Sequence, residues 1–129
     1  MQILPFLMFT GQAEEAMTFY VSLFPRSQVI SVERYGAEGP GPAGTIKQAV
    51  FELNALRMRC FDSPAAHAFT FTPALSLFVD CDSQADLDQA FERLAQGGQV
   101  LMPVDAYGFS RRFGWVQDRF GVSWQLNLP

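Results

Sequence analysis

Two arginines on one short segment are the residues of this chain best suited to binding an anion, and a glutamate lies on the segment before it. Arg57 and Arg59 follow the pair Asn54-Ala55, and Glu52 precedes that pair by two positions. Alternate residues of a strand share one face, and Asn54 can adopt the positive φ of a two-residue hairpin turn. We therefore expect Glu52 to form an ion pair with Arg57 across a hairpin. We also expect Arg57 and Arg59 to bind a carboxylate or phosphate.

The same alternation divides the two expected strands, 46–53 and 56–62, between two faces. One face is apolar and should pack on helices, and it holds Ala49, Phe51, Leu53, Leu56, Met58 and Cys60. The opposite face holds Gln48, Val50, Glu52, Arg57, Arg59 and Phe61. The alternation alone leaves open whether this second face lines a binding site or is exposed to solvent, as in many antiparallel sheets.

A second polar face is expected near the end of the chain, on the strand 122–128. Its apolar side holds Val122, Trp124, Leu126 and Leu128. Its polar side holds Ser123, Gln125 and Asn127, which should be joined by Ala74, Ser76 and Phe78 from the strand 74–80. The spacing leaves the position of Trp115 open, because this side chain could line the polar side or pack against Trp124.

These strands belong to a pattern of elements that occurs twice. The first copy of the pattern predicts strands at 3–9, 29–35, 46–53 and 56–62. It also predicts an amphipathic helix that begins at Ala13 and is stopped by Pro25. The second copy predicts strands at 74–80, 99–102, 109–117 and 122–128. Its helix is capped by Ser83 and ended by Gly97-Gly98. This repeat predicts one α+β domain, 1–129, built from two βαβββ modules, 1–63 and 73–129, with a linker at 64–72.

Composition limits the function classes that the chain can serve. Of its 129 residues, 49% are hydrophobic and only 17% are charged, and the net charge is -4 without a basic stripe. We therefore expect a homodimer that hides apolar surface, and no nucleic-acid partner. No apolar stretch is long enough for a membrane span, and the apolar start reads as a strand, not as a signal peptide. The two cysteines indicate no disulfide framework, so we expect a cytoplasmic protein.

Four segments, in this order along the chain, resemble a known family. They are GQAEEAMTFYVSLFP at 11–25, RYGAEGPGPAGT at 34–45, FELNALRMRCFD at 51–62 and GWVQDRFGVSWQL at 114–126. The chain resembles the vicinal oxygen chelate superfamily, which includes glyoxalase I, extradiol dioxygenases and bleomycin-resistance proteins. It is most similar to the PhnB-like branch, often labelled 3-demethylubiquinone-9 3-methyltransferase. The resemblance implies a curved mixed sheet that forms a cup around a small molecule, with helices outside. It also implies a homodimer, in some members with exchanged modules.

The metal ligands of that superfamily have no counterparts in this chain. The positions that the resemblance implies fall at Pro5, about Arg59, Ala74 and Gln125, and of these only the last has a side chain able to coordinate a divalent ion. The single histidine, His67, lies in the expected linker. We therefore expect no metal site, no cofactor, and neither glyoxalase I nor extradiol dioxygenase activity.

Other reactive side chains have structural interpretations. Cys60 should be a buried small hydrophobe, and the carboxylates beside Cys81 should raise the pKa of its thiol. His67 is expected in a loop, although it could close over the cup as a base. Three arginines, Arg111, Arg112 and Arg119, are expected to be solvated or to lie at the rim of a dimer interface.

Three functions follow from these observations. The first is metal-independent binding of a small anionic or polar molecule by Gln48, Glu52, Arg57, Arg59, Ser76, Trp115, Ser123 and Gln125. The second is an enzyme, either a lyase or isomerase with Glu52 as its base or a metal enzyme with unusual ligands. Methyl transfer gains no support from the sequence, because the Gly-rich stretch 36–44 lies between two strands and contains Pro40 and Pro42. The third is a protein-binding module that acts through its dimer surface.

Overall fold

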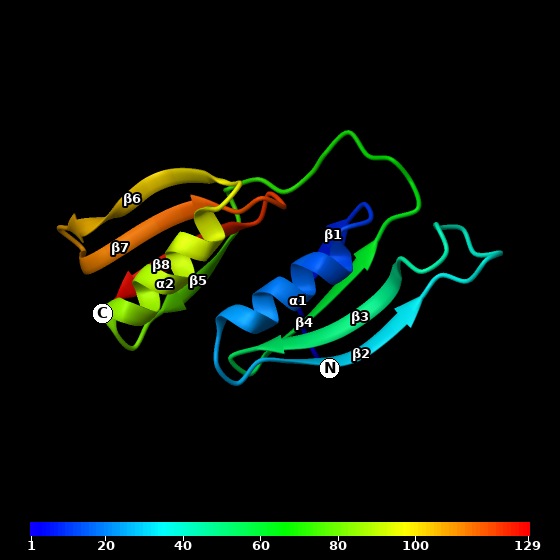
Figure 1. Ribbon diagram of the computed structural model, residues 1–129, viewed down its shortest axis with the longest axis horizontal. Helices are drawn as coiled ribbons and strands as arrows, with labels where there is room; N and C mark the ends of the chain where they lie inside the picture. Colours follow the sequence, from blue (N-terminus) through cyan, green and yellow to red (C-terminus); the bar gives the residue numbers. More distant parts are fainter. The chain divides into compact units, whose positions relative to one another are not determined.

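The computed structural model describes all residues from 1 to 129, and it divides into two compact units, Met1–His67 and Ala68–Pro129 (Figure 1). The expected linker 64–72 contains the boundary between these units. Each unit holds one four-stranded mixed sheet and one helix. The predicted α+β fold of two βαβββ modules is therefore confirmed.

The first module has its helix on one face of its sheet. Its elements are β1 (Phe6–Phe9), α1 (Ala13–Leu23), β2 (Gln28–Arg34), β3 (Ile46–Leu53) and β4 (Leu56–Asp62). The strand order is β1-β4-β3-β2, in which β1 and β4 run parallel and the other neighbours antiparallel. The hairpin between β3 and β4 turns at Asn54 and Ala55, whose φ angles of 49° and 70° are those of the predicted two-residue turn.

The second module repeats this topology. Its elements are β5 (Ser76–Asp80), α2 (Gln84–Ala95), β6 (Gln99–Tyr107), β7 (Ser110–Gln117) and β8 (Ser123–Leu128). The strand order is β5-β8-β7-β6, and the parallel pair is β5 with β8. Strand β6 extends five residues beyond the predicted end at Met102. Pro103 is tolerated within it because β6 is an edge strand with irregular register.

Each helix buries a stripe of small and large apolar side chains against its own sheet. Helix α1 buries Ala13, Ala16, Met17 and Tyr20, and it packs on β2, β3 and β4. Helix α2 buries Leu87, Ala90, Phe91 and Leu94 against β6, β7 and β8. The hydroxyl of Ser83 accepts a hydrogen bond from the Asp86 backbone N–H at 3.1 Å, which confirms the predicted cap.

A buried carboxylate holds three segments of the first module together. One oxygen of Asp62 accepts hydrogen bonds from the backbone N–H groups of Gly11 at 2.7 Å and Ala13 at 3.0 Å. Its other oxygen accepts from the Ile46 N–H at 2.9 Å. Asp62 is 3% exposed, so these bonds compensate the cost of burying its charge. They join the end of β4 to the start of α1 and the start of β3.

The second module also has a buried carboxylate, but it serves one turn. Asp118 accepts hydrogen bonds from the backbone N–H groups of Phe120 at 2.9 Å and Val122 at 3.0 Å. Its second oxygen accepts from the indole N–H of Trp124 at 2.9 Å. All three donors lie within six residues of Asp118, so this network shapes the turn between β7 and β8.

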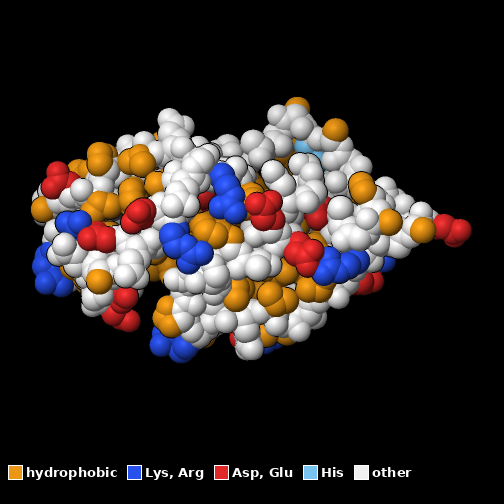
Figure 2. Space-filling model, in the orientation of Figure 1, with side chains coloured by type: hydrophobic (Ala, Val, Ile, Leu, Met, Phe, Trp, Pro, Cys, Tyr) orange, Lys and Arg blue, Asp and Glu red, His pale blue; other side chains and the backbone are white.

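The exposed surface mixes charges of both signs with apolar side chains. On the face shown in Figure 2, Lys and Arg are interspersed with Asp and Glu. Neither helix has the length and apolar character that crossing a membrane requires.

Candidate functional site

The face of the first sheet opposite α1, which we call the first distal face, carries the predicted anion-binding residues. The residues that alternate with them on β3 and β4, namely Ala49, Phe51, Met58 and Cys60, are fully buried on the helix side. One expectation was wrong. Leu56 is 49% exposed, because it stands at the first position of β4, beside the turn.

Arg59 lies at the centre of the first distal face between two apolar neighbours. In the strand register it stands opposite Phe6 of β1 on one side and Val50 of β3 on the other. It is exposed, and it forms no ion pair. A guanidinium with no carboxylate partner keeps its donors and its charge available for a ligand.

An aromatic pair lies beside Arg59. The rings of Phe6 and Phe61 stack with centroids 4.9 Å apart and an interplanar angle of 22°. Phe6 remains 58% exposed, although it is a large apolar residue on a strand. The importance of Phe6 was missed from the sequence. The signal that could have found it is the parallel pairing of the first strand with the fourth, which places Phe6 next to Arg59.

Arg57 has a partner, as predicted. Its guanidinium contacts a Glu52 oxygen at 3.2 Å, and the other Glu52 oxygen accepts a hydrogen bond from the side-chain amide of Gln28 at 3.1 Å. The hydrogen bond from Gln28 and then the contact with Arg57 lower the pKa of Glu52. A carboxylate with a lowered pKa is a weaker base, and the charge of Arg57 is partly compensated. Gln48 is exposed on the same face and stands opposite Glu33.

The face of the second sheet opposite α2, the second distal face, carries four of the predicted polar residues in one network. The hydroxyls of Ser76 and Ser123 lie 2.7 Å apart. The indole N–H of Trp115 donates to Ser123 at 2.8 Å, and the amide of Gln125 donates to Ser76 at 3.1 Å. Trp115 stands opposite Gln125 in the register, which resolves the question of its face. Trp124 is on the other face, where it bonds to Asp118.

Ser123 is 1% exposed, whereas its alternation with Trp124 predicted a side chain on an accessible face. The face was predicted correctly, but the indole of Trp115 reaches diagonally across the strands to Ser123. Phe78 adds an exposed ring to the same face, with its centroid 6.4 Å from that of Phe113. Phe113 itself packs edge-on against Tyr107 and Phe109.

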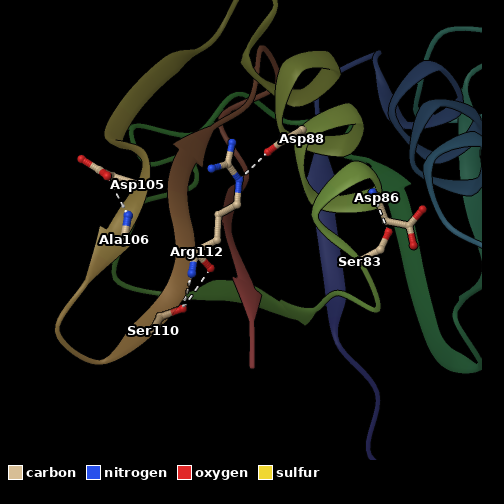
Figure 3. A network of polar contacts seen from close by, with 7 residues as sticks. All are labelled: Ser83, Asp86, Asp88, Asp105, Ala106, Ser110 and Arg112. Carbon is tan, nitrogen blue, oxygen red and sulfur yellow. Dashed lines mark hydrogen bonds and ion pairs between the residues drawn. The ribbon is translucent and has the colours of Figure 1, made fainter.

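The arginines of the second module are not simply solvated. Figure 3 shows Arg112 reaching from β7 to Asp88 of α2, at 2.8 Å. The guanidinium of Arg111 donates to the backbone oxygen of Pro129 at 2.9 Å, and that of Arg119 lies 4.4 Å from the centroid of the Phe120 ring. All three contacts are within the module. Arg111 and Arg119 are exposed to solvent as expected, and Arg112 is only partly exposed because it pairs with Asp88.

The positions implied for metal ligands do not form a cluster of coordinating groups. Pro5 and Ala74 precede β1 and β5, and no group of three His, Cys, Asp or Glu side chains is arranged to hold a metal ion. His67 contacts the hydroxyl of Ser63 at 2.9 Å through its Nε2 atom. Both thiols are held protonated. Burial raises the pKa of Cys60 to about 12, and burial followed by the charge of Asp86 raises that of Cys81 to about 11.

The fold identifies a class of protein. A glyoxalase-related enzyme from Fulvimarina pelagi matches the whole chain and 89% of its own length with a TM-score of 0.65 at 15% identity, which shows the shared fold. The chain therefore has the glyoxalase-like fold of two βαβββ modules.

The family follows from matches at higher similarity. The model of the family described as 3-demethylubiquinone-9 3-methyltransferase matches residues 1–127, and the chain belongs to this family. A PhnB protein from Bacillus cereus that carries the same methyltransferase label is 51% identical over the full length of both chains, with a TM-score of 0.98. Protein PA1353 from Pseudomonas aeruginosa is 29% identical over 99% of this chain and 97% of its own, with a TM-score of 0.84.

Proposed function

We propose that this protein binds a small anionic molecule on its first distal face without the help of a metal ion. The observation that carries the proposal is Arg59, an arginine without an ion pair, set between Phe6 and Val50. A guanidinium forms charge-assisted, often bidentate, hydrogen bonds with a carboxylate or phosphate, and that of Arg59 has no protein carboxylate that competes for it.

The surroundings of Arg59 also define the body of the ligand. Phe6 and Phe61 form a stacked pair with an exposed edge beside the cation. Aromatic rings attract flat apolar groups, so an anion attached to an aromatic ring fits this face better than a bare inorganic ion. Gln48, Glu52 and Gln28 supply polar groups around it.

Benzoate tests the proposal, because it combines a carboxylate with a ring. We expect benzoate to shift the NMR signal of the Arg59 side-chain N–H group in the wild type. Arg59→Ala should weaken binding about tenfold or more, since a hydrogen bond to a charged group contributes about 1.5–3 kcal/mol. Its unfolding free energy should change by less than about 0.5 kcal/mol, because the residue is exposed.

Arg57→Ala is the matched control, because it removes the same side chain two residues away on the same face. Arg57 already contacts Glu52, so its loss should weaken benzoate binding less than about threefold, as expected for an exposed, partly compensated charge. Equal affinities of the wild type and the Arg59→Ala variant would overturn the proposal.

We further infer that the protein works as a homodimer in the cytoplasm. Exposed apolar side chains along the edge strand β2, at Val29, Ile30 and Val32, support the dimer, since an uncovered edge strand is prone to pair with another chain. Native mass spectrometry of untagged protein, purified without added metal, measures the oligomer, any bound small molecule and any metal together. A monomer would contradict the dimer, and a stoichiometric metal would contradict metal-independent binding.

The family description favours one second candidate, which is methyl transfer. It requires that the protein bind S-adenosylmethionine, which calorimetry measures directly. The Glu52 carboxylate is a weak candidate for a base in any reaction, because its partners lower its pKa. A turnover that Glu52→Gln abolished, with benzoate binding intact, would replace the binding function by an enzyme.

A further inference from the structure

In the polar network of the second distal face, the chemistry of the groups determines which one donates each hydrogen bond and which one accepts it. An indole N–H can only donate, so the Ser123 oxygen accepts from Trp115. The Ser76 oxygen accepts from the Gln125 amide. What remains is the single hydrogen bond between the two hydroxyls, in which either oxygen could be the donor.

Burial decides between the two directions. If Ser76 donated to Ser123, the Ser123 hydrogen would have no acceptor, and this residue is 1% exposed with no bond other than those to Trp115 and Ser76. An unsatisfied buried donor is costly. Ser123 therefore donates to Ser76, and the network runs from Trp115 through Ser123 to Ser76.

This direction leaves one hydrogen without a partner. Ser76 accepts from both Ser123 and Gln125, so its own O–H is free, and Ser76 is partly exposed. Phe78, two residues along the same strand and face, is exposed, and the indole of Trp115 lies on the neighbouring part of the sheet. The free donor thus lies beside aromatic surface, next to the unused oxygen of the Gln125 amide.

We propose that the second distal face is a binding site for the acceptor oxygen of an uncharged aromatic carbonyl compound, with Ser76 as the donor. The inference rests on the proposed function, since it takes the distal faces as small-molecule sites. It adds a second site with different chemistry. The first module binds a negative charge through Arg59, whereas the second recognises a neutral carbonyl oxygen through a hydroxyl that its neighbours hold in the donating orientation.

Acetophenone is the probe, because it has a ring, a carbonyl oxygen and no charge. The readout is the indole N–H signal of Trp115 during an NMR titration, assigned with Trp115→Phe. Trp124 is an internal control, since its indole bonds to Asp118 on the other face. We expect acetophenone to shift the Trp115 signal and leave the Trp124 signal in place. The control compound ethylbenzene has a similar shape but no carbonyl oxygen, and it should bind about fivefold more weakly or not at all.

Three serine variants separate the role of the Ser76 donor from general damage to the network. Ser76→Ala removes the free donor and should weaken acetophenone binding about fivefold, as expected for one neutral hydrogen bond. Ser123→Ala keeps the Ser76 hydroxyl but removes the hydrogen bond that orients it, so affinity should fall by less than it does in Ser76→Ala. Ser76→Thr keeps a hydroxyl and should bind like the wild type, which guards against a Ser76→Ala variant that fails to fold.

The outcomes distinguish this inference from the function on which it rests. Unchanged acetophenone affinity in Ser76→Ala, or equal binding of ethylbenzene, would overturn the carbonyl site even if Arg59→Ala lost benzoate. Unchanged benzoate affinity in Arg59→Ala would overturn the anion site, whatever acetophenone shows. The combination expected is loss of benzoate in Arg59→Ala with acetophenone unaffected, and the reverse in Ser76→Ala.

Discussion

Arg59 and Gln125 occupy equivalent positions in two modules of the same topology. Each lies on the strand that pairs in parallel with the first strand of its module and antiparallel with the third. Arg59 stands opposite Phe6 and Val50, and Gln125 stands opposite Phe78 and Trp115. The same strand pairing therefore presents a charged side chain in the first module and an amide in the second. The shared topology supplies each of these two side chains with aromatic neighbours.

The residues two positions earlier sharpen this contrast. Arg57 of the first module corresponds to Ser123 of the second. Arg57 is exposed and paired with Glu52, whereas Ser123 is buried in a hydrogen-bond network. The first face is thus organised by charge and the second by hydrogen-bond direction. Salt should weaken ligands of the first face far more than those of the second.

The largest difference that we expect between the modules concerns their buried carboxylates. Asp62→Ala should lower the unfolding free energy by about 4 kcal/mol, because three backbone N–H groups from two distant segments lose their acceptor. Asp118→Ala should cost about half as much, since its donors lie within six residues of it, in a turn that can relax and at the start of β8. Urea denaturation measures both, with the exposed Glu38→Ala as the control. Equal losses for Asp62 and Asp118 would contradict this account.

The second difference concerns the distance between helix and sheet. A Cβ on Gly114 would lie 2.5 Å from the Phe91 ring and 2.8 Å from a Val104 methyl carbon. Gly114 stands opposite Leu126 as Ala49 stands opposite Cys60 in the first module. We expect Gly114→Ala to cost about 2 kcal/mol through overpacking. In calorimetry, adding Phe91→Leu should recover part of that loss. A double variant whose losses simply add would show that Phe91 is not the obstacle.

The smallest expected effect is a pH dependence confined to the first module. The hydrogen bond from Arg34, on β2, lowers the pKa of Glu14, on α1, from its ordinary value of 4.5. A lowered pKa gives a contribution to stability that is present above that ordinary value and is lost as the pH falls through the folded value. Because both side chains are largely exposed, Glu14→Gln should cost only about 0.3 kcal/mol at pH 7. The variant and the wild type should converge at pH 2 in urea titrations. A constant difference at both pH values would show that the effect is not electrostatic.

Local patterns predicted most of the fold. The turn at Asn54-Ala55 sets the register of β3 and β4, so Glu52 had to face Arg57, and it does. The helix caps and the buried stripes were predicted for the same reason, since they depend on residues within a few positions of one another. The errors at Leu56 and at the end of β6 lie at strand ends, where alternation no longer determines burial.

Contacts between distant segments could not be predicted in the same way. The pair of Arg112 with Asp88 requires knowing how α2 lies over β7, and the burial of Ser123 requires the rotamer of Trp115. The role of Asp62 depends on N–H groups up to 51 residues away. The ligand roles of Gln48, Glu52, Arg57, Arg59, Ser76, Trp115, Ser123 and Gln125 stay predictions, because they depend on a molecule that neither pattern nor packing specifies.

The pairing of the first strand of each module with its last strand has a consequence during synthesis on the ribosome. Strand β1 emerges early, but its partner β4 ends only at Asp62, and β5 likewise waits for β8, which ends at Leu128. At a synthesis rate of about 5–20 residues per second, β1 waits several seconds with Leu7 and Phe9 uncovered. Each module therefore has a first strand that waits without its sheet partner during synthesis. Strands β2 and β3, which pair with each other, are complete at Leu53 and can form their hairpin before the wait of β1 ends.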